Sequence, residues 1–266
     1  MDNQRTIIIS GGNPFVKKLT LLLKQKKART ESGLFILEGA RAVREIPPEW
    51  HVAHIVMAES FAGRDDAATL ANRADVTVLS DSLFNKISDT QHPQGVMAVC
   101  AQKSATLKAC LPASDLIIFA DKLADPGNLG VMIRTAAAAG CGGVVLSNGC
   151  ADVYNPKTLR ACAGTFFRIP VIDGVDTADG LKAIGEMGFC RVATHPRDGV
   201  APYHLDFKRK CCILIGNEAD GISADALALC DATVNIPMAA GVESLNATIA
   251  GSMILYEAVR QRRRPV

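Results

Sequence analysis

Short apolar runs alternate with helix-like segments through the second half of the chain. Runs of strand length occupy residues 116–120, 144–146, 168–172, 190–194, 212–215 and 233–236. Between and after them, apolar residues recur with a helical period in residues 129–139, 156–163, 178–187, 224–229 and 245–262. Strands that alternate with helices predict a parallel sheet covered on both faces. We therefore expect an α/β domain over residues 115–266.

The first part of the chain carries the same kinds of segment in a smaller arrangement. Apolar runs at residues 34–37, 52–57, 76–79 and 96–100 are separated by helix-like stretches such as residues 67–74. These runs predict a small α/β domain over residues 1–105. The pattern then loosens into Gln, Lys, Ser, Thr and Pro, which places a linker at residues 106–114.

Composition agrees with two folded domains. A chain of 266 residues exceeds the usual size of one domain, and its 48% hydrophobic and 21% charged residues are near the averages for globular proteins. These values count against disorder, collagen and coiled coil. The formal net charge is only +2, so any binding of nucleic acid must depend on local patches.

Neither a membrane segment nor a metal site is expected. No apolar stretch approaches the roughly 18–20 residues that cross a bilayer, and no apolar signal segment follows Met1. The nine cysteines include no C-x-x-C pair, and His51 and His54 lack neighbouring ligands. We expect a cytoplasmic protein with reduced thiols, no membrane partner and no metal.

One basic stretch stands out near the N-terminus. No acidic residue interrupts it before Glu31, and the apolar positions Leu19, Leu22 and Leu23 within it have helical spacing. One face of such a helix can pack while another presents cations to solvent or to phosphates. The candidate RNA-binding residues are Lys17, Lys18, Lys24, Lys26, Lys27 and Arg29.

The loops after the predicted strands are where a ligand is expected. Ligands of parallel sheets bind beyond the carboxyl ends of the strands, here after Ala120, Thr194, Ile215 and Ile236. Neither G-x-G-x-x-G after a strand nor G-x-x-x-x-G-K-[ST] is present. Their absence counts against a dehydrogenase, an NTPase and a Rossmann-type methyltransferase.

Three unusual segments follow these strands instead: residues 125–137 (DPGNLGVMIRTAA), 215–221 (IGNEADG) and 235–248 (NIPMAAGVESLNAT). In order and spacing they resemble the three signature motifs of the SpoU/TrmH family of RNA ribose 2′-O-methyltransferases, within the SPOUT superfamily. The resemblance extends from about residue 114 to 264. The first part of the chain, including residues 35–39 (FILEG) and 91–95 (QHPQG), looks like the ribosomal-protein-like RNA-binding domain of many members.

The resemblance implies a fold, a cofactor and an assembly. The catalytic domain would be an α/β-knot, with a deep trefoil knot formed by the second and third segments, an exception to the rule that chains do not thread loops. The methyl donor would be S-adenosylmethionine. The protein would be a homodimer paired near the cofactor, so that one subunit could complete the active site of the other.

Arg134 is the matched catalytic arginine. It follows Leu129 by five residues, about 140° further around a helix, and so points away from the apolar row Leu129, Met132 and Ala136. A ribose 2′-hydroxyl is a poor nucleophile, so negative charge that develops on its oxygen must be stabilised. Activation of the hydroxyl, electrostatic stabilisation and phosphate clamping are all open roles, although a guanidinium rarely gives up a proton.

Four more residues match catalytic positions of the family: Asn128, Glu218, Ser244 and Asn246. Asn128 precedes the predicted helix and could also be its N-cap. Ser244 could likewise cap the last helix, with Asn246 in its first turn. Glu218 follows a buried strand, where it could orient Arg134 or hydrogen-bond the substrate.

The resemblance also assigns the cofactor. Gly216, Ile236 and Leu245 match the family's cofactor positions, with Thr194 and Met238 as neighbours. S-adenosylmethionine carries no phosphate, so an apolar slot with a few backbone partners can hold it without a glycine-rich phosphate loop.

The sequence thus predicts methyl transfer to a ribose 2′-hydroxyl of structured RNA. Large-subunit ribosomal RNA is the first choice because a separate RNA-binding domain is present, and transfer RNA is the second. An alternative is a catalytically silent RNA-binding or assembly factor on the same scaffold, although all the matched polar positions hold the expected residues. A nicotinamide-dependent oxidoreductase would need a phosphate-binding turn that the sequence lacks.

Overall fold

The computed structural model describes residues 6–65, 67–111 and 115–263. By its contacts the chain divides into two compact units, Met1–Lys103 with Tyr154–Gly164, and Ser104–Val153 with Thr165–Val266. The predicted boundaries differ in two places. Within the predicted linker, a short helix α7 (Leu107–Cys110) leads to Leu111, which is fully buried in the core of the second unit. The segment Tyr154–Gly164 makes its contacts with the first unit.

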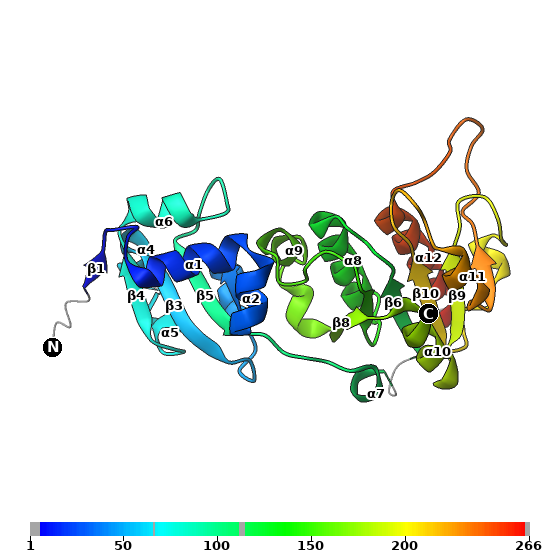
Figure 1. The fold of residues 1–266 in the computed structure, drawn as a ribbon, viewed down its shortest axis with the longest axis horizontal. Coiled ribbons are helices and arrows are strands. Elements are labelled where there is room, and N and C mark those ends of the chain that lie inside the picture. The colour runs from blue at the N-terminus through cyan, green and yellow to red at the C-terminus, as the bar shows by residue number, and fades with distance from the viewer. Residues whose placement is uncertain (1–5, 66, 112–114, 264–266) are drawn as a thin grey trace. The chain divides into compact units, whose positions relative to one another are not determined.

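A five-stranded mixed sheet forms the centre of the first unit (Figure 1). Its order is β1-β4-β3-β5-β2, with β5 antiparallel to β2 and β3 and the remaining pairs parallel. The four predicted apolar runs all lie in strands. The strands are β1 (Ile7–Ile8), β2 (Leu34–Glu38), β3 (Val52–Ala58), β4 (Val76–Leu79) and β5 (Val96–Ala101).

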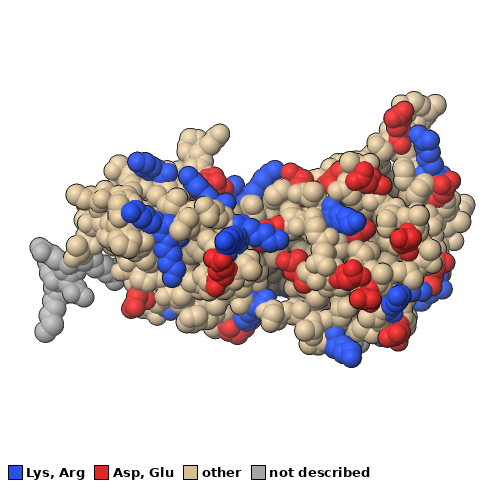
Figure 2. Space-filling view, viewed as in Figure 1, with Lys and Arg blue, Asp and Glu red and all other residues tan. Residues whose placement is uncertain are grey.

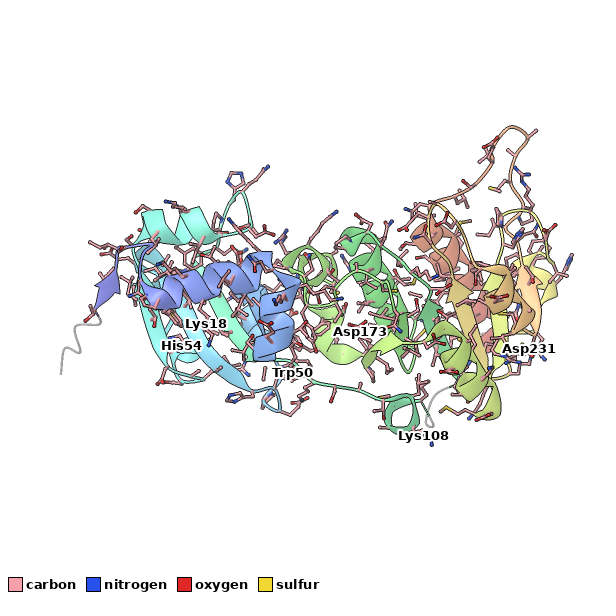
Figure 3. All side chains as sticks on the ribbon, in the orientation of Figure 1. Lys18, Trp50, His54, Lys108, Asp173 and Asp231 are labelled. Atoms are coloured by element: carbon pink, nitrogen blue, oxygen red, sulfur yellow. The ribbon has the colours of Figure 1, made fainter. Side chains whose placement is uncertain are left out.

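Helix α1 (Pro14–Lys24) carries the predicted basic face. Asn13 caps it and Pro14 opens it, and it buries Val16, Leu19, Leu22 and Leu23. Its packing on the sheet includes a Phe15 ring 4.8 Å from the ring of His54 on β3, and Figure 3 labels His54 and Lys18. The lysines of α1 and of α2 (Lys26–Ser32) are exposed, and Figure 2 shows cations gathered on this side of the first unit.

The other helices of the first unit are short. Predicted residues 67–74 form a helix only to Ala71. In the predicted helix 156–163, the regular part ends at Ala161, since Ala163 has a positive φ of 48°. Apart from α1, the helices of this unit are α2 (Lys26–Ser32), α3 (Ala40–Arg44), α4 (Glu59–Ala62), α5 (Ala67–Ala71), α6 (Asp81–Ile87) and α9 (Pro156–Ala161), and α1 itself is Pro14–Lys24.

Arg29 differs from the other residues of the basic stretch. Its side chain is only 2% exposed, and Nη1 donates to the carbonyl oxygens of Leu22 at 2.6 Å and Leu23 at 3.3 Å. Carbonyls in the last turn of a helix lack intrahelical partners, so the guanidinium satisfies the end of α1. The prediction that Arg29 binds RNA was therefore wrong, because its guanidinium is buried and donates to the carbonyls at the end of α1.

Arg29→Ala should lower the free energy of unfolding by about 2 kcal/mol, because it leaves buried carbonyls of α1 without their donor. Urea unfolding of the full chain measures this loss. Lys27→Ala is the matched control, since Lys27 is exposed and forms a surface ion pair with Glu31 at 3.7 Å. Its effect should stay within about 0.5 kcal/mol. Equal stability of the two variants would contradict a structural role for Arg29.

Six parallel strands form the sheet of the second unit, as predicted. Their order is β11-β9-β10-β6-β7-β8, and β6 and β10 in the middle are buried along their whole length. Such continuous apolar runs suit strands covered on both faces. The strands are β6 (Leu116–Ala120), β7 (Val144–Ser147), β8 (Val171–Val175), β9 (Cys190–Thr194), β10 (Cys211–Ile215) and β11 (Ala232–Val234).

Several predicted boundaries in this unit were wrong: the predicted helix 129–139 begins at Pro126, and the predicted strand 233–236 ends at Val234. The predicted strand 168–172 begins later, because Thr165–Arg168 forms a 3-10 turn and the strand starts after Pro170. The last helix starts at Ala247 rather than at Leu245. The helices of the unit, in addition to α7, are α8 (Pro126–Ala138), α10 (Thr177–Glu186), α11 (Ala224–Ala228) and α12 (Ala247–Arg262), with 3-10 turns at Thr165–Arg168 and Pro202–His204.

The four loops that the sequence selected start at one edge of this sheet. Strands β11, β9, β10 and β6 are consecutive neighbours and all parallel, so their carboxyl ends lie side by side. Helices α8 and α12 pack together, and the orange loop in Figure 1 joins β11 to α12. The trefoil knot of this region stays a prediction. No helix in the described ranges is long and apolar enough to span a membrane.

Candidate active site

A cavity of about 490 Å³ opens at this edge of the sheet. Its walls come from the loops after β9, β10 and β11 and from the first turns of α12. Val234, Ile254 and Ala250 contribute apolar surface from these elements. All five predicted cofactor residues line it: Thr194, Gly216, Ile236, Met238 and Leu245.

The turn after β10 has room only for a glycine at its start. Asn217 and Gly221 exchange backbone hydrogen bonds of 3.1 and 3.0 Å, which fold residues 216–221 into a tight turn. A Cβ on Gly216 would lie 2.5 Å from the carbonyl carbon of Gly221 and 2.7 Å from the Ile222 side chain. The absence of a side chain therefore allows the turn to close against the wall of the cavity.

Three of the predicted catalytic side chains form one hydrogen-bonded cluster. Asn128 Nδ2 donates to Glu218 Oε1 at 2.8 Å, and Asn246 Nδ2 donates to Asn128 Oδ1 at 3.3 Å. Thr248 Oγ1 adds a bond of 3.2 Å to the carbonyl oxygen of Asn128. The cluster joins the three signature segments, and Glu218 and Asn246 also line the cavity. Both ends of the Asn128 amide are thus used, so its orientation is fixed.

The predicted helix caps fall on other residues. Asp125 caps α8 by accepting from the backbone N–H of Asn128 at 2.8 Å, and Pro126 occupies the first helical position. Asn128 therefore lies inside the helix and is not its N-cap. Asn246 caps α12 by accepting from the N–H groups of Thr248 and Ile249. Ser244 is exposed in the loop before this cap and lines the cavity.

Arg134 is not among the residues that line the cavity of its own chain. It lies six residues beyond Asn128 on α8, where it is exposed, as predicted from the apolar row on the opposite side of that helix. Six residues of α-helix rise about 9 Å. Within one chain, Arg134 is therefore separated from the Asn128 cluster, whereas the other four candidates lie in or beside the cavity.

Sequence reasoning missed several residues that shape the site. Asn217 Nδ2 donates to the carbonyl oxygen of Lys122 at 2.8 Å, and its Oδ1 accepts from the N–H of Ala219 at 2.8 Å. His195 lines the cavity, and its Nδ1 accepts from the N–H of Asp198 at 2.8 Å. An Asp-Pro pair before a helix and an Asn at a turn are signals that could have located Asp125 and Asn217.

The cavity is electrostatically negative. Glu218 and Asp220 line it, and no lysine or arginine is among the described residues of its wall. Such a wall disfavours phosphate groups and favours a cationic ligand.

No cysteine is among the described residues of the cavity wall. All nine cysteines are free, and burial raises the pKa of the Cys141 and Cys162 thiols to about 12. A thiol with so high a pKa carries little of the nucleophilic thiolate at neutral pH. In the described part of the chain, no group of three or more His, Cys, Asp or Glu side chains is placed to hold a metal ion.

Asn246→Ala should lower the free energy of unfolding by about 1 kcal/mol through loss of the α12 cap. Asn246→Asp is the matched variant, since a carboxylate keeps the cap but cannot donate to Asn128. Urea unfolding separates the two roles, since Asn246→Asp should match the wild-type stability. The methyl transfer that the sequence predicts should fall in both variants. Wild-type transfer by Asn246→Asp would remove the amide donor from the site's chemistry.

The chain matches known proteins over both units. Residues 115–256 match the model of the SpoU rRNA Methylase family, and residues 13–98 match the MRM3-like substrate binding domain. A 23S rRNA (guanosine(2553)-2′-O)-methyltransferase of Bacillus subtilis is 32% identical, over 88% of this chain and 92% of its own length.

Solved structures agree with this match. An AdoMet-bound rRNA methyltransferase from Sinorhizobium meliloti has a TM-score of 0.88 and 30% identity, over 98% of this chain and 100% of its own. The SpoU methyltransferase AviRb from Streptomyces viridochromogenes in complex with AdoMet has a TM-score of 0.86 and 31% identity, over 94% of this chain and 98% of its own. With its sheet, its three converging segments and these matches, the chain belongs to the SpoU rRNA methylase family.

Proposed function

We propose that this protein transfers a methyl group from S-adenosylmethionine to a ribose 2′-hydroxyl of structured RNA, with large-subunit ribosomal RNA as the substrate. The observation that carries the proposal is the hydrogen-bonded cluster of Asn128, Glu218 and Asn246 beside the cavity. It joins three segments that are far apart in the sequence, at the edge of a parallel sheet where ligands bind.

The cavity fits the methyl donor. Its volume of about 490 Å³ is within the range for cofactor sites, and Ile236, Met238 and Leu245 offer apolar surface to an adenine ring. Gly216 would bring backbone close to the ligand, and Glu218 and Asp220 would favour the positive sulfonium. When bound, S-adenosylmethionine supplies an electrophilic methyl carbon with a neutral thioether as the leaving group.

The residues of the chain would then act on the attacking oxygen. The ribose 2′-oxygen forms a bond to the methyl carbon as the carbon–sulfur bond breaks, and the hydroxyl proton leaves to a base or to solvent. Negative charge develops on that oxygen before the bond is complete, and a guanidinium at Arg134 would stabilise it. Asn128, held by Glu218 and Asn246, would fix the position of the ribose.

The first unit would bind the RNA. Its match to a substrate binding domain supports a large structured substrate, and ribosomal RNA is preferred over transfer RNA on that ground. The presence of Arg134, Glu218 and Asn246 in addition to the cavity argues against a catalytically silent RNA-binding factor. We place this activity in the cytoplasm.

A homodimer would complete the site. Exposed apolar side chains line one face of α12, with Ile249 54%, Met253 49% and Tyr256 73% exposed, and Val131 on α8 is 44% exposed. Contiguous apolar surface of this kind marks an interface. Helices α8 and α12 pack together, so a second copy that covers this face would lie against α8, which carries Arg134. Arg134 could in this way serve the cavity of the partner.

Met253→Arg with Tyr256→Arg should convert the dimer to a monomer and abolish methyl transfer, because two charges would be buried in an apolar interface. Light scattering after size exclusion gives the mass. Leu21→Arg is the matched control, since Leu21 is 45% exposed on α1 in the first unit and should leave the dimer intact. A monomeric wild-type protein with full activity would contradict the shared site.

Mapping of ribose methylation in RNA from cells with and without this protein tests the substrate. The proposal predicts that a 2′-O-methyl mark disappears from large-subunit ribosomal RNA. Loss of a mark only from transfer RNA would support the second substrate, and unchanged methylation of both RNAs would favour the silent factor.

A further inference from the structure

We infer that an arginine-lined groove in the first unit, separate from the lysines of α1 and α2, holds an unpaired nucleotide of the RNA together with its flanking phosphates. The inference rests on the proposed function, because it assigns the surface through which the substrate is bound. Two segments of the sequence, residues 35–39 and 91–95, have no role in the active site.

Hydrogen bonds join the ends of these two segments. The N–H of Gly39 donates to the carbonyl oxygen of Val96 at 3.0 Å, and the N–H of Ala40 donates to Gln94 Oε1 at 2.8 Å. Gly95 has a φ of 79°, and a Cβ there would lie 2.9 Å from the Cβ of Phe61. The close packing fixes the loop before β5 against the start of α3, so the surface around it is preformed.

One side of this junction is a cationic cleft of about 640 Å³. Arg41, Arg44 and Arg64 line it and are exposed, and Asp81 is the acidic residue among the described residues of its wall. Asp81 Oδ1 is occupied, since it accepts from Ser60 Oγ at 2.7 Å and from the Ser60 N–H at 3.1 Å. Arginine binds phosphate through two parallel N–H groups, so three arginines on one wall suit a sugar–phosphate backbone.

Arg41 can reach a phosphate without giving up its partner. Its side chain is 82% exposed, and it uses Nε to donate to Glu45 Oε1 at 2.9 Å. A guanidinium whose Nε–H is occupied still has a pair of parallel N–H groups at its end, one on each terminal nitrogen. The cavity in the second unit has the opposite sign, with two carboxylates and no cation on its described wall, so the two cavities suit different ligands.

A second cavity, of about 350 Å³, adjoins the cleft, because Arg41 and Gln94 line both. Its apolar surface comes from Ile36, Leu159 and Pro156. Its polar groups come from Thr90, His92, Glu38, Glu45 and Arg160, which pairs with Asp89 at 2.7 Å. Unpaired RNA bases are recognised in this way, by an apolar or aromatic surface for the ring and polar groups for its edge. A base in this cavity would have its phosphates beside Arg41, and the backbone would continue toward Arg44 and Arg64.

Fluorescence anisotropy of the full-length protein with two labelled RNAs, a hairpin with an unpaired loop and a blunt duplex of equal stem, tests the groove over a range of salt. We expect the wild type to prefer the hairpin. Arg41→Ala, Arg44→Ala and Arg64→Ala together should weaken binding at least about tenfold and reduce the slope of log affinity against log salt by roughly 2. The matched triple variant Lys24→Ala, Lys26→Ala and Lys27→Ala should lose less on both measures.

Ala42→Phe fills the smaller cavity from α3 and should abolish the preference for the hairpin while it leaves the salt slope unchanged. Melting curves of each variant establish that it is folded. Wild-type affinity and slope in the arginine variant, a larger loss in the lysine variant, or a retained hairpin preference in Ala42→Phe would each overturn the inference. Binding is measured without methyl donor, so a failure of methyl transfer alone leaves the groove intact.

Discussion

Arg134→Ala should lower the single-turnover rate of methyl transfer by about 10²–10³-fold, the usual cost of removing one group that stabilises a developing oxyanion. The side chain is exposed on α8 and lies outside the cavity of its own chain, so its loss should leave the fold and the binding of S-adenosylmethionine nearly unchanged. Transfer of labelled methyl to ribosomal RNA gives the rate, and calorimetric titration gives cofactor affinity.

Two variants sharpen this test. Arg134→Lys keeps the charge but loses the planar fork, so it should recover part of the rate. Lys182→Ala is the matched control, because it removes a cation from α10, a helix with no residue on the cavity wall, and it should transfer methyl at the wild-type rate. A folded Arg134→Ala protein with full activity would remove this arginine from the mechanism.

Gly216→Ala should weaken binding of S-adenosylmethionine by more than about tenfold. The added methyl group would meet backbone atoms of Gly221 and the side chain of Ile222, so the turn from residue 216 to 221 would have to open. Displacement of this turn moves Glu218 and Asp220, which line the cavity. A shift of about 1 Å in positioning groups can cost 10²-fold in rate, so methyl transfer should fall as well.

Gly63→Ala is the matched control for this substitution. A Cβ on Gly63 meets no atom within 4 Å, and the residue is exposed at the end of α4 in the first unit. It should bind the methyl donor as the wild type does. Wild-type cofactor affinity in Gly216→Ala would contradict this prediction. It would show that the turn accommodates a Cβ and that cofactor binding does not depend on its conformation.

The central strands were predictable because their signal is local. Leu116–Ala120 and Cys211–Ile215 are unbroken apolar runs, and burial on both faces of a parallel sheet demands that pattern wherever the strands pair. The start of α8 was missed although the signal was local too. Asp125 and Pro126 form a strong helix start, but the prediction followed the apolar row and began at Leu129.

The contacts between distant residues could not be predicted from pattern. Asn128 meets Glu218 across 90 positions and Asn246 across 118, and no periodicity links such separations. The parallel-sheet rule placed the loops at one edge of the sheet, and the resemblance of the three segments to a family indicated that these three meet there. Arg29 shows the converse, since a cation in a basic run was assigned to the surface and instead closes the end of α1. The presence of a charged residue in a basic run does not show whether its side chain is exposed or buried.

The most direct test of the account is an analysis of nucleosides from ribosomal RNA that the purified protein has treated with methyl-labelled S-adenosylmethionine. RNA from cells that lack the protein provides unmodified substrate. The account predicts that the label enters a 2′-O-methylated nucleoside and that Asn246→Asp and Arg134→Ala sharply reduce it. Label on a base, or no label from a folded protein that binds the methyl donor, would contradict it.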